Sequence, residues 1–240
     1  MNPLNRPPHS GTALRVITIV AVLTGAGQIV ADYLGPPVVV YALKPLTMVL
    51  IIAIAASAVR RPEWFYPAAV TAGLAISLVG DVFLMLPGNY FIPGLVSFLL
   101  AHLVYIAAFS AALPLRFSIG SILPFAAYGA LVFALIAPGL GGMTVPVALY
   151  LVVILVMGWR AVERWHALGS LSGRLAAMGA LLFLASDTAL AVNRFMSSFE
   201  ASDLVIMTTY YTGQWLIAVS AVAAAVNHNR PSGSERDTPT

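Results

Sequence analysis

Residues 67–112 read PAAVTAGLAISLVGDVFLMLPGNYFIPGLVSFLLAHLVYIAAFSAA, and this stretch decides how the rest of the chain is interpreted. It holds two apolar runs, 67–86 and 91–112, separated only by a Pro-Gly-Asn-Tyr break. A helix rises about 1.5 Å per residue, so a run of about 20 apolar residues crosses a hydrocarbon layer of about 30 Å. Each run carries one ionisable residue, Asp81 and His102 respectively. The pattern predicts two membrane-spanning helices joined by a short turn.

The composition of the whole chain agrees with this interpretation. Of 240 residues, 60% are hydrophobic and 9% are charged, against about 25% charged residues in an ordinary soluble domain. The mean hydropathy is +0.92. A soluble surface needs more polar groups, so the composition excludes a soluble enzyme, a disordered chain and a nucleic-acid-binding protein. The chain has 0 cysteines, which excludes disulfides, thiolate chemistry and Cys-ligated metals.

Apolar runs of similar length recur along the chain, separated by breaks rich in Gly, Pro or charge. We therefore predict an all-α, polytopic membrane bundle of eight transmembrane helices that forms a single domain over 13–228. The polar segments 1–12 and 229–240 are expected to be disordered cytoplasmic tails. The predicted spans are 14–34, 38–59, 67–86, 91–112, 118–137, 144–162, 175–195 and 205–226.

The distribution of Lys and Arg predicts the orientation of these spans. Ten of the 12 basic residues fall in the tails and in alternate loops, and the other loops contain none. Basic residues favour the cytoplasmic side, so both termini are expected to be cytoplasmic, in a multi-pass protein of a bacterial inner (plasma) membrane. The ten are Arg6, Arg15, Arg60, Arg61, Arg116, Arg160, Arg164, Arg174, Arg230 and Arg236. Only Lys44 and Arg194 remain, and both lie inside predicted spans.

Ionisable residues inside spans are few, and each one suggests a functional site because burying it in hydrocarbon is costly. With the predicted topology, polar groups from five helices fall in the outer half of the membrane, with His102 near mid-depth. The inner half is expected to be almost wholly apolar. The converging residues are Gln28, Asp32, Lys44, Asp81, His102, Asp187, Arg194, Tyr210, Tyr211 and Gln214.

Structural explanations compete with functional ones for several of these residues. Lys44 can simply neutralise Asp32 or Asp81, because a buried charge needs a partner. His102 can be a hydrogen-bonding clamp between helices, and Arg194 can extend to the outer surface. Three acidic and two basic residues lie at one depth, so at least one acid has no basic residue to pair with. This excess favours a functional role for Asp81 and Asp187.

The motifs present restrict the possible chemistry. The chain has no G-x-S-x-G elbow, no H-E-x-x-H and no phosphate-binding glycine loop. One His and no Cys in the spans are too few ligands for a zinc site. We therefore expect neither a metal nor a cofactor, and we expect a chelator to leave activity intact. What remains is a site with two carboxyl groups, which is suited to general acid–base catalysis.

Several motifs, taken in order, resemble the YhhN-like lysoplasmalogenase family of integral membrane proteins. They are Lys44-Pro45-Leu46-Thr47, the 80–86 segment around Asp81, the 91–105 segment with His102, Ser186-Asp187, Asn193-Arg194-Phe195, and Tyr210-Tyr211-x-x-Gln214. The resemblance implies an enzyme that cleaves the vinyl ether bond of lysoplasmalogens to a fatty aldehyde and glycerophosphoethanolamine or glycerophosphocholine. It also implies that Asp81 and Asp187 are the catalytic acids. Lys44, His102, Asn193, Tyr211 and Gln214 match motif positions without an assigned role.

Vinyl ether hydrolysis fits this inventory of residues. A general acid protonates the carbon β to oxygen, and a carboxylate stabilises the resulting oxocarbenium ion and directs water, as in glycosidases. The residues do not show which Asp is the acid. Arg194 is the better candidate to bind the lipid phosphate, and Lys44 to keep one Asp ionised. The expected partners are a vinyl ether lysophospholipid and membrane lipid, with no nucleic acid.

A second reading is a small transporter, or a bundle that moves protons or lipids, with the same acids as a relay. Such proteins often interrupt a helix at mid-membrane. Here the helix-breaking prolines lie near the ends of spans. An apolar inner half would also offer no polar path, so the pattern favours the enzyme.

Overall fold

The computed structural model describes residues 11–59, 65–111, 113 and 119–227. Within these ranges the chain forms α-helices and one short 3₁₀ turn, η2 (Gly141–Met143), and no strand. The all-helical prediction is confirmed. The helices are α1 (Gly11–Leu34), α2 (Pro37–Ala56), α3 (Phe65–Met85), α4 (Phe91–Ser110), α5 (Ile119–Leu140), α6 (Thr144–Leu168), α7 (Leu171–Phe195) and α8 (Ser202–Asn227). The predicted tails, and Arg6, Arg60, Arg61, Arg116, Arg230 and Arg236, lie outside the described residues, apart from residues 11 and 12, which begin α1.

Each predicted apolar run corresponds to one helix, although several ends differ. Helix α5 continues through Pro138 to Leu140, where we expected a break, and α6 extends to Leu168 instead of 162. Six helical segments of the described chain are long and apolar enough to cross a membrane. One of them, Ile119–Leu168, contains both α5 and α6, and α8 is not among the six. These segments support an integral, multi-pass membrane protein.

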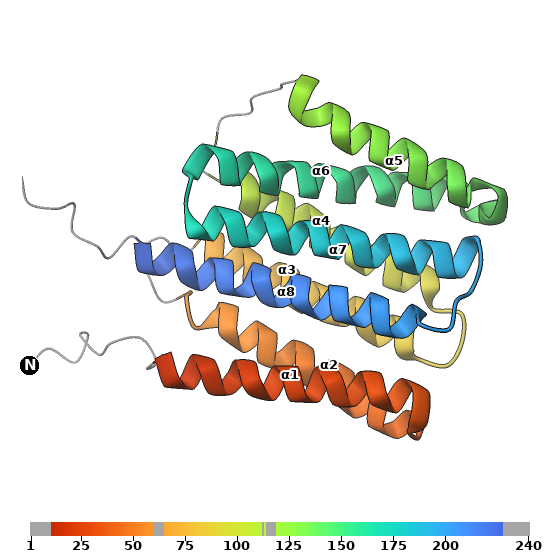
Figure 1. The fold of residues 1–240 in the computed structure, drawn as a ribbon, viewed down its shortest axis with the longest axis horizontal. Helices are drawn as coiled ribbons and strands as arrows, with labels where there is room; N and C mark the ends of the chain where they lie inside the picture. The colour runs from red at the N-terminus through yellow and green to blue at the C-terminus, as the bar shows by residue number, and fades with distance from the viewer. Residues whose placement is uncertain (1–10, 60–64, 112, 114–118, 228–240) are drawn as a thin grey trace, which may run out of the picture.

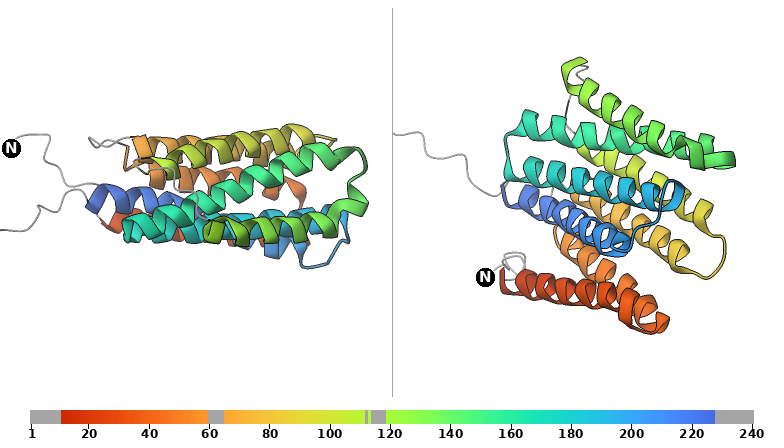
Figure 2. Two further views of the ribbon diagram at one scale, coloured as in Figure 1. Left: turned by 90° about the horizontal axis from the view of Figure 1, so that it is seen from above. Right: turned by 45° about the vertical axis from the view of Figure 1, so that its right-hand side comes forward.

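The helices run roughly side by side along one direction (Figures 1 and 2). The α1–α2, α3–α4, α5–α6 and α7–α8 connections all lie at one end, which we call the distal end (Figure 1). Helix α1 begins, and α8 finishes, at the opposite, proximal end. Helices α1 and α5 lie at the two margins of the bundle, and the polar site lies between the helices that separate them.

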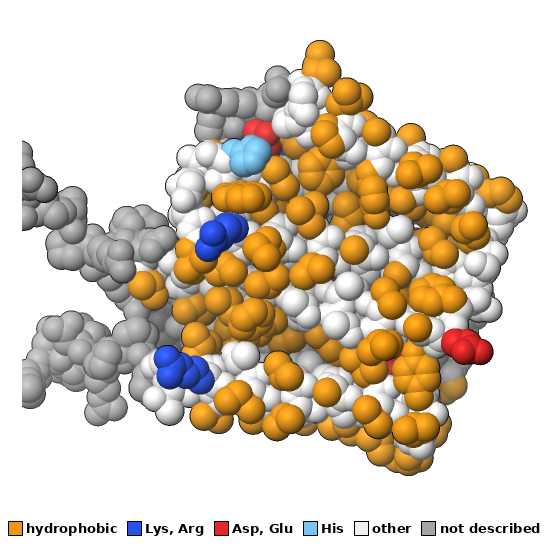
Figure 3. All heavy atoms as spheres, in the orientation of Figure 1, with side chains coloured by type: hydrophobic (Ala, Val, Ile, Leu, Met, Phe, Trp, Pro, Cys, Tyr) orange, Lys and Arg blue, Asp and Glu red, His pale blue; other side chains and the backbone are white. Residues whose placement is uncertain are grey.

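The outward faces of the helices are apolar. In one space-filling view, hydrophobic side chains cover most of the face and the charged side chains lie towards its two ends (Figure 3). Leu131 of α5 and Leu23 of α1, for example, are 59% and 65% exposed. A water-soluble protein rarely exposes apolar patches of this extent, so these faces are suited to contact lipid tails.

Close contact between α7 and α8 depends on two glycines. A Cβ atom added at Gly179 would lie 2.7 Å from the carbonyl oxygen of Gly213, and one added at Gly213 would lie 2.9 Å from that of Gly179. Small residues let the backbones of membrane helices approach each other in this way. Gly179 thereby fixes α7, the helix that carries Asp187, against α8, which carries Tyr210.

The expectation that charged residues mark a loop fails at one place in the described chain. Arg160 and Arg164, which we placed in a loop, lie inside α6 near the proximal end and are only 1% and 6% exposed. Arg160 Nε donates a hydrogen bond to Ser110 Oγ (2.9 Å), and the Arg164 guanidinium lies 3.9 Å from the centre of the Tyr66 ring. Arg160 thus reaches the last residue of α4, and Arg164 reaches the beginning of the neighbouring helix α3. A cation is favourable at a helix C-terminus because the last carbonyl groups carry partial negative charge.

Candidate active site

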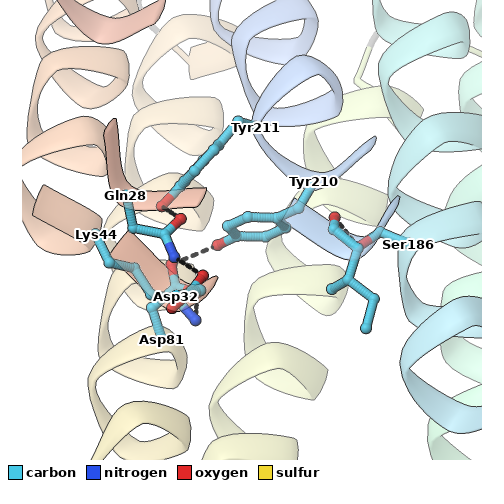
Figure 4. Close-up of polar contacts among 8 residues, drawn as sticks. Gln28, Asp32, Lys44, Asp81, Ser186, Tyr210 and Tyr211 are labelled. Atoms are coloured by element: carbon cyan, nitrogen blue, oxygen red, sulfur yellow. Dashed lines mark hydrogen bonds and ion pairs between the residues drawn. The ribbon is translucent and has the colours of Figure 1, made fainter. Parts of the chain in front are cut away.

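Asp81 lies on α3, is 2% exposed and contacts groups from two other helices (Figure 4). Tyr210 Oη of α8 donates a hydrogen bond of 2.6 Å to Asp81 Oδ2. Lys44 Nζ of α2 lies 3.8 Å from Asp81 Oδ1, the only ion pair among the described residues. A buried charge is costly unless it is paired and hydrogen-bonded, and Asp81 has both kinds of partner.

A hydrogen-bonded chain extends the polar region from α8 to α1 (Figure 4). Tyr211 Oη donates to Gln28 Oε1 (3.1 Å), and Gln28 Nε2 donates to Asp32 Oδ2. Gln28 is 1% exposed, whereas Asp32 is exposed near the distal end of α1. The i,i+4 spacing of these two residues places them on one helix face, as their sequence predicts.

Asp187 has a different environment on α7. It is half-buried and accepts a hydrogen bond from Tyr150 Oη of α6. It lines a narrow apolar pocket, which also includes Phe98, Leu184 and Arg194. No ion pair involves Asp187 within the part of the chain that the structure describes. Its only described hydrogen-bond donor is therefore a neutral phenol.

Aromatic side chains fill the space between the two carboxyl groups. The Phe183 ring lies 5.3 Å from Tyr210 and 4.8 Å from His102, centre to centre, and His102 lies 5.2 Å from Tyr150. The rings therefore run from the phenol that holds Asp81 to the phenol that holds Asp187. The two carboxyl groups accept hydrogen bonds from the phenols at the two ends of this row of rings. They belong to one region of the protein but have different immediate partners.

The other predicted site residues divide into two groups. His102 and Gln214 are 0% exposed beside this region, and Gln214 Oε1 accepts a hydrogen bond of 2.9 Å from Tyr105 Oη. Asn193 and Arg194 lie near the distal end of α7. Asn193 Oδ1 accepts the backbone N–H of Phe199 (3.2 Å), and the Arg194 guanidinium lies 3.8 Å from the centre of the Phe91 ring. The structure thus places Lys44 and Tyr210 against Asp81, and it places Arg194, but not Asn193, on the lining of the apolar pocket.

Tyr150 is the contact that the sequence analysis missed. It is one hydroxyl group within the apolar run of α6, without the helical spacing to another polar residue that marked the other helices. Among the described residues, no group of three His, Cys, Asp or Glu side chains is placed to hold a metal ion. Two carboxyl groups with phenol donors, one of them on the lining of an apolar pocket, are suited to exchange protons with a bound lipid.

Three pockets surround this region. The apolar pocket lies between α3, α4, α5, α6 and α7 and includes Asp187. A polar pocket of about 330 Å³ near the distal end includes Lys44 and Asp32. Leu84, three residues after Asp81 on α3, lines both of them. A third, apolar groove of about 400 Å³ lies between α1, α2 and α8.

Comparison with known proteins places the chain in a family. The human protein named lysoplasmalogenase TMEM86A is 38% identical over 171 residues, which cover 66% of this chain and 68% of that protein. The human lysoplasmalogenase TMEM86B is 36% identical over 170 residues, 70% of each chain. The membrane protein YhhN of Escherichia coli O157:H7 is 30% identical over 190 residues, 79% of this chain and 90% of that one. No solved structure matches. The model of the YhhN family matches residues 39–221, and the chain therefore belongs to the YhhN family.

Proposed function

We propose that this chain is an enzyme that hydrolyses the vinyl ether bond of lysoplasmalogens. The products are a fatty aldehyde and glycerophosphoethanolamine or glycerophosphocholine. The similarity to proteins named lysoplasmalogenase supports the reaction. The observation that carries the proposal is the pair of carboxyl groups with unlike partners, since Asp81 pairs with Lys44 and Asp187 accepts from Tyr150.

Unlike partners suit the two carboxyl groups to different roles. The Lys44 ammonium group favours the ionised form of Asp81, so Asp81 acts as the carboxylate that stabilises positive charge and directs water. Asp187 borders an apolar pocket and has no ion-pair partner in the described chain, so it is the general acid. This division follows the rule that two carboxyl groups in different environments take the acid and base roles separately.

The reaction then proceeds in three balanced steps. Asp187 gives its proton to the vinyl carbon β to the ether oxygen, and an oxocarbenium ion forms. Asp81 takes a proton from water as the water oxygen adds to the cationic carbon, which leaves a hemiacetal. The hemiacetal collapses to the aldehyde and the glycerol hydroxyl group, with a proton moved between its two oxygens, and the proton that Asp81 took from water returns to Asp187 through solvent before the next turnover. Acid–base assistance of this kind contributes about 10² to 10⁴ in rate.

The alkenyl chain is assigned to the apolar pocket. This pocket includes Asp187 directly and meets the polar pocket at Leu84, one turn from Asp81. A lipid that passes Leu84 therefore presents its ether group to both acids. The apolar pocket is narrow, so α5, which forms its outer wall with Val132 and Ile136, must move outward to admit the chain.

The membrane arrangement proposed with this activity has eight transmembrane helices and both termini in the cytoplasm of a bacterial cell. The positive residues Arg15, Arg164 and Arg174 lie toward the proximal end, which supports a cytoplasmic location for that end. Asp81 and Asp187 then lie in the outer half of the bilayer.

The direct test is to incubate the purified protein with a lysoplasmalogen and measure free aldehyde. The matched control substrate is the lysophospholipid with a saturated ether, which cannot be protonated to an oxocarbenium ion. Aldehyde from the vinyl ether alone supports the proposal. Absence of aldehyde from both would contradict it and favour the alternative, a transporter that uses the same acids as a proton relay.

The pocket assignment has its own test. Ala191→Trp fills the apolar pocket and should reduce turnover of substrates with long alkenyl chains more than that of short ones. Ala26→Trp fills the α1–α8 groove in the same way and is the control. A chain-length effect from Ala26→Trp alone would assign the alkenyl chain to the groove instead.

A further inference from the structure

The polar pocket at the distal end differs from the other two pockets in its charges. Lys44 lines it from α2, Asp32 from α1 and Asp203 from the first turn of α8. Its volume is about 330 Å³. Because Asp81 pairs with Lys44, the pocket begins one side chain away from the proposed site of catalysis.

The charges in this pocket are unevenly matched. Lys44, the single basic residue on its described lining, already faces the Asp81 carboxylate at 3.8 Å. Asp32 and Asp203 line this pocket together with Lys44. The Asp32 and Asp203 carboxylates therefore share one cavity, while the nearby Lys44 ammonium group is paired with Asp81. Like charges held together are unfavourable unless a cation lies between them.

Side-chain contacts hold the Asp32 carboxylate and the backbone beside Asp203 in place. The buried Gln28 amide donates to Asp32, and Tyr211 in turn donates to Gln28. On the other wall, Tyr33 Oη donates to the backbone carbonyl of Glu200 (3.1 Å) and accepts the backbone N–H of Leu204 (3.2 Å). Tyr33 thus ties the end of α1 to the start of α8, one residue from Asp203. These contacts orient the pocket before any ligand arrives, which lowers the entropic cost of binding.

We propose that Asp32 and Asp203 bind the ammonium group of a zwitterionic lipid head group, whose phosphodiester faces Lys44. In this arrangement the anionic phosphodiester lies nearer the proposed catalytic acids and the ammonium group lies nearer the distal surface. Phosphoethanolamine and phosphocholine carry their two charges in this order. The proposal rests on the function proposed above and adds how the enzyme selects its substrate. A bare phosphate head group would bring a second negative charge towards the two carboxylates and is disfavoured.

The test compares two vinyl ether lysophospholipids, one with an ethanolamine head group and one with a bare phosphate. Asp32→Asn and Asp203→Asn should each lower the ratio of kcat/KM for the first substrate over the second by about tenfold, mainly through KM, as expected for loss of one charge-assisted hydrogen bond. Glu200→Gln is the matched control, because Glu200 is an exposed acid of the same region that does not line the pocket. Its ratio should stay at the wild-type value.

A second measurement does not depend on turnover. Glycerophosphoethanolamine should raise the unfolding temperature of the detergent-solubilised wild-type protein more than glycerol 3-phosphate does, and the two Asp→Asn variants should lose that difference. If wild-type protein releases aldehyde but neither variant changes the ratio, the ammonium site is wrong and the proposed function stands. If wild-type protein releases no aldehyde, the proposed function fails. The unfolding temperatures then decide whether the pocket binds this head group.

Discussion

At the scale of single residues, the two carboxyl groups differ in ways that the chain sequence does not reveal. Both follow a small residue in an apolar helix, Gly80 before Asp81 and Ser186 before Asp187. In the folded chain Asp81 has a phenol and an ammonium partner, whereas Asp187 has a phenol alone. The difference comes from Lys44 and Tyr150, which are distant in sequence from the acids they approach.

Replacing either acid by its amide should abolish most turnover and preserve folding. Asp81→Asn and Asp187→Asn should each reduce kcat by roughly 10²-fold or more, because a general acid or base is lost. Asn keeps the volume of the side chain and can still accept the phenol hydrogen bond, so circular dichroism should show that both variants fold, although Asp81→Asn leaves the Lys44 ammonium group without its partner and should lower the unfolding temperature. Turnover near the wild-type rate in one variant would remove that residue from the mechanism.

The two cations near the site should affect different kinetic constants. Lys44→Met should lower kcat, because Lys44 pairs with the reacting carboxylate of Asp81. Arg194→Gln should chiefly raise KM, because Arg194 lines the apolar pocket, and its contact with an unreacting part of the bound lipid is equally strong in the ground and transition states. Steady-state kinetics on a single lysoplasmalogen measure both. An effect of Arg194→Gln on kcat alone would show that this division is wrong.

At the scale of helices, pairs of neighbours are held together by close backbone contact, and the site depends on one such pair. Helices α7 and α8 carry Asp187 and Tyr210, and their backbones meet at Gly179 and Gly213. Gly73 of α3 likewise accommodates the Tyr105 ring of α4, since an added Cβ would lie 2.4 Å from that ring. Gly73 and Gly179 each precede a proposed catalytic Asp by eight residues.

Adding a methyl group between α7 and α8 should destabilise the protein. Gly179→Ala places a Cβ 2.7 Å from a backbone oxygen that cannot move aside easily, so we expect a cost of about 1–3 kcal/mol, as for other overpacked cores. Gly142→Ala is the control, because nothing lies within 4 Å of its added Cβ. Thermal unfolding in detergent compares the two. Equal stability of both variants would contradict the close packing of α7 on α8.

At the scale of the whole molecule, the proposed site depends on where the bundle sits in the membrane. All four connections at the distal end lie near polar groups of the site, including Asp32, Asp203 and Arg194. A lysophospholipid of the outer leaflet would enter with its head group at this end. The location of the distal end is therefore the most informative property of the intact protein.

Reporter fusions should place the distal end outside the cell. Fusions at Gly88 and at Gly141, in the α3–α4 and α5–α6 connections, should report an external location, because those connections hold no Lys or Arg. A fusion at Gly169, between α6 and α7, should report the cytoplasm. An internal signal at Gly88 would invert the orientation and place the site in the inner half of the bilayer.

The sequence alone determined the helical architecture, because hydropathy is a local property of the chain. Apolar runs of membrane length predicted where each helix lies, and Gly, Pro and charge predicted most breaks. Spacing also predicted which polar residues share a helix face, as for Gln28 and Asp32 on α1, but not the contact of Tyr150 on α6. The same local rule failed at Arg160 and Arg164, since charge was interpreted as a loop and the residues are buried in α6.

Only the tertiary structure decided which helices supply the partners of each Asp and where the pockets lie. The pairing of Lys44 with Asp81 rather than Asp32, and the contact of Tyr150 with Asp187, join helices that no local pattern relates. Helix rotation and neighbour choice depend on packing between distant segments, such as Gly179 on Gly213. The polar pocket includes residues from the end of α1 and the start of α8, which Tyr33 ties together through Leu204, a residue 171 positions later in the sequence.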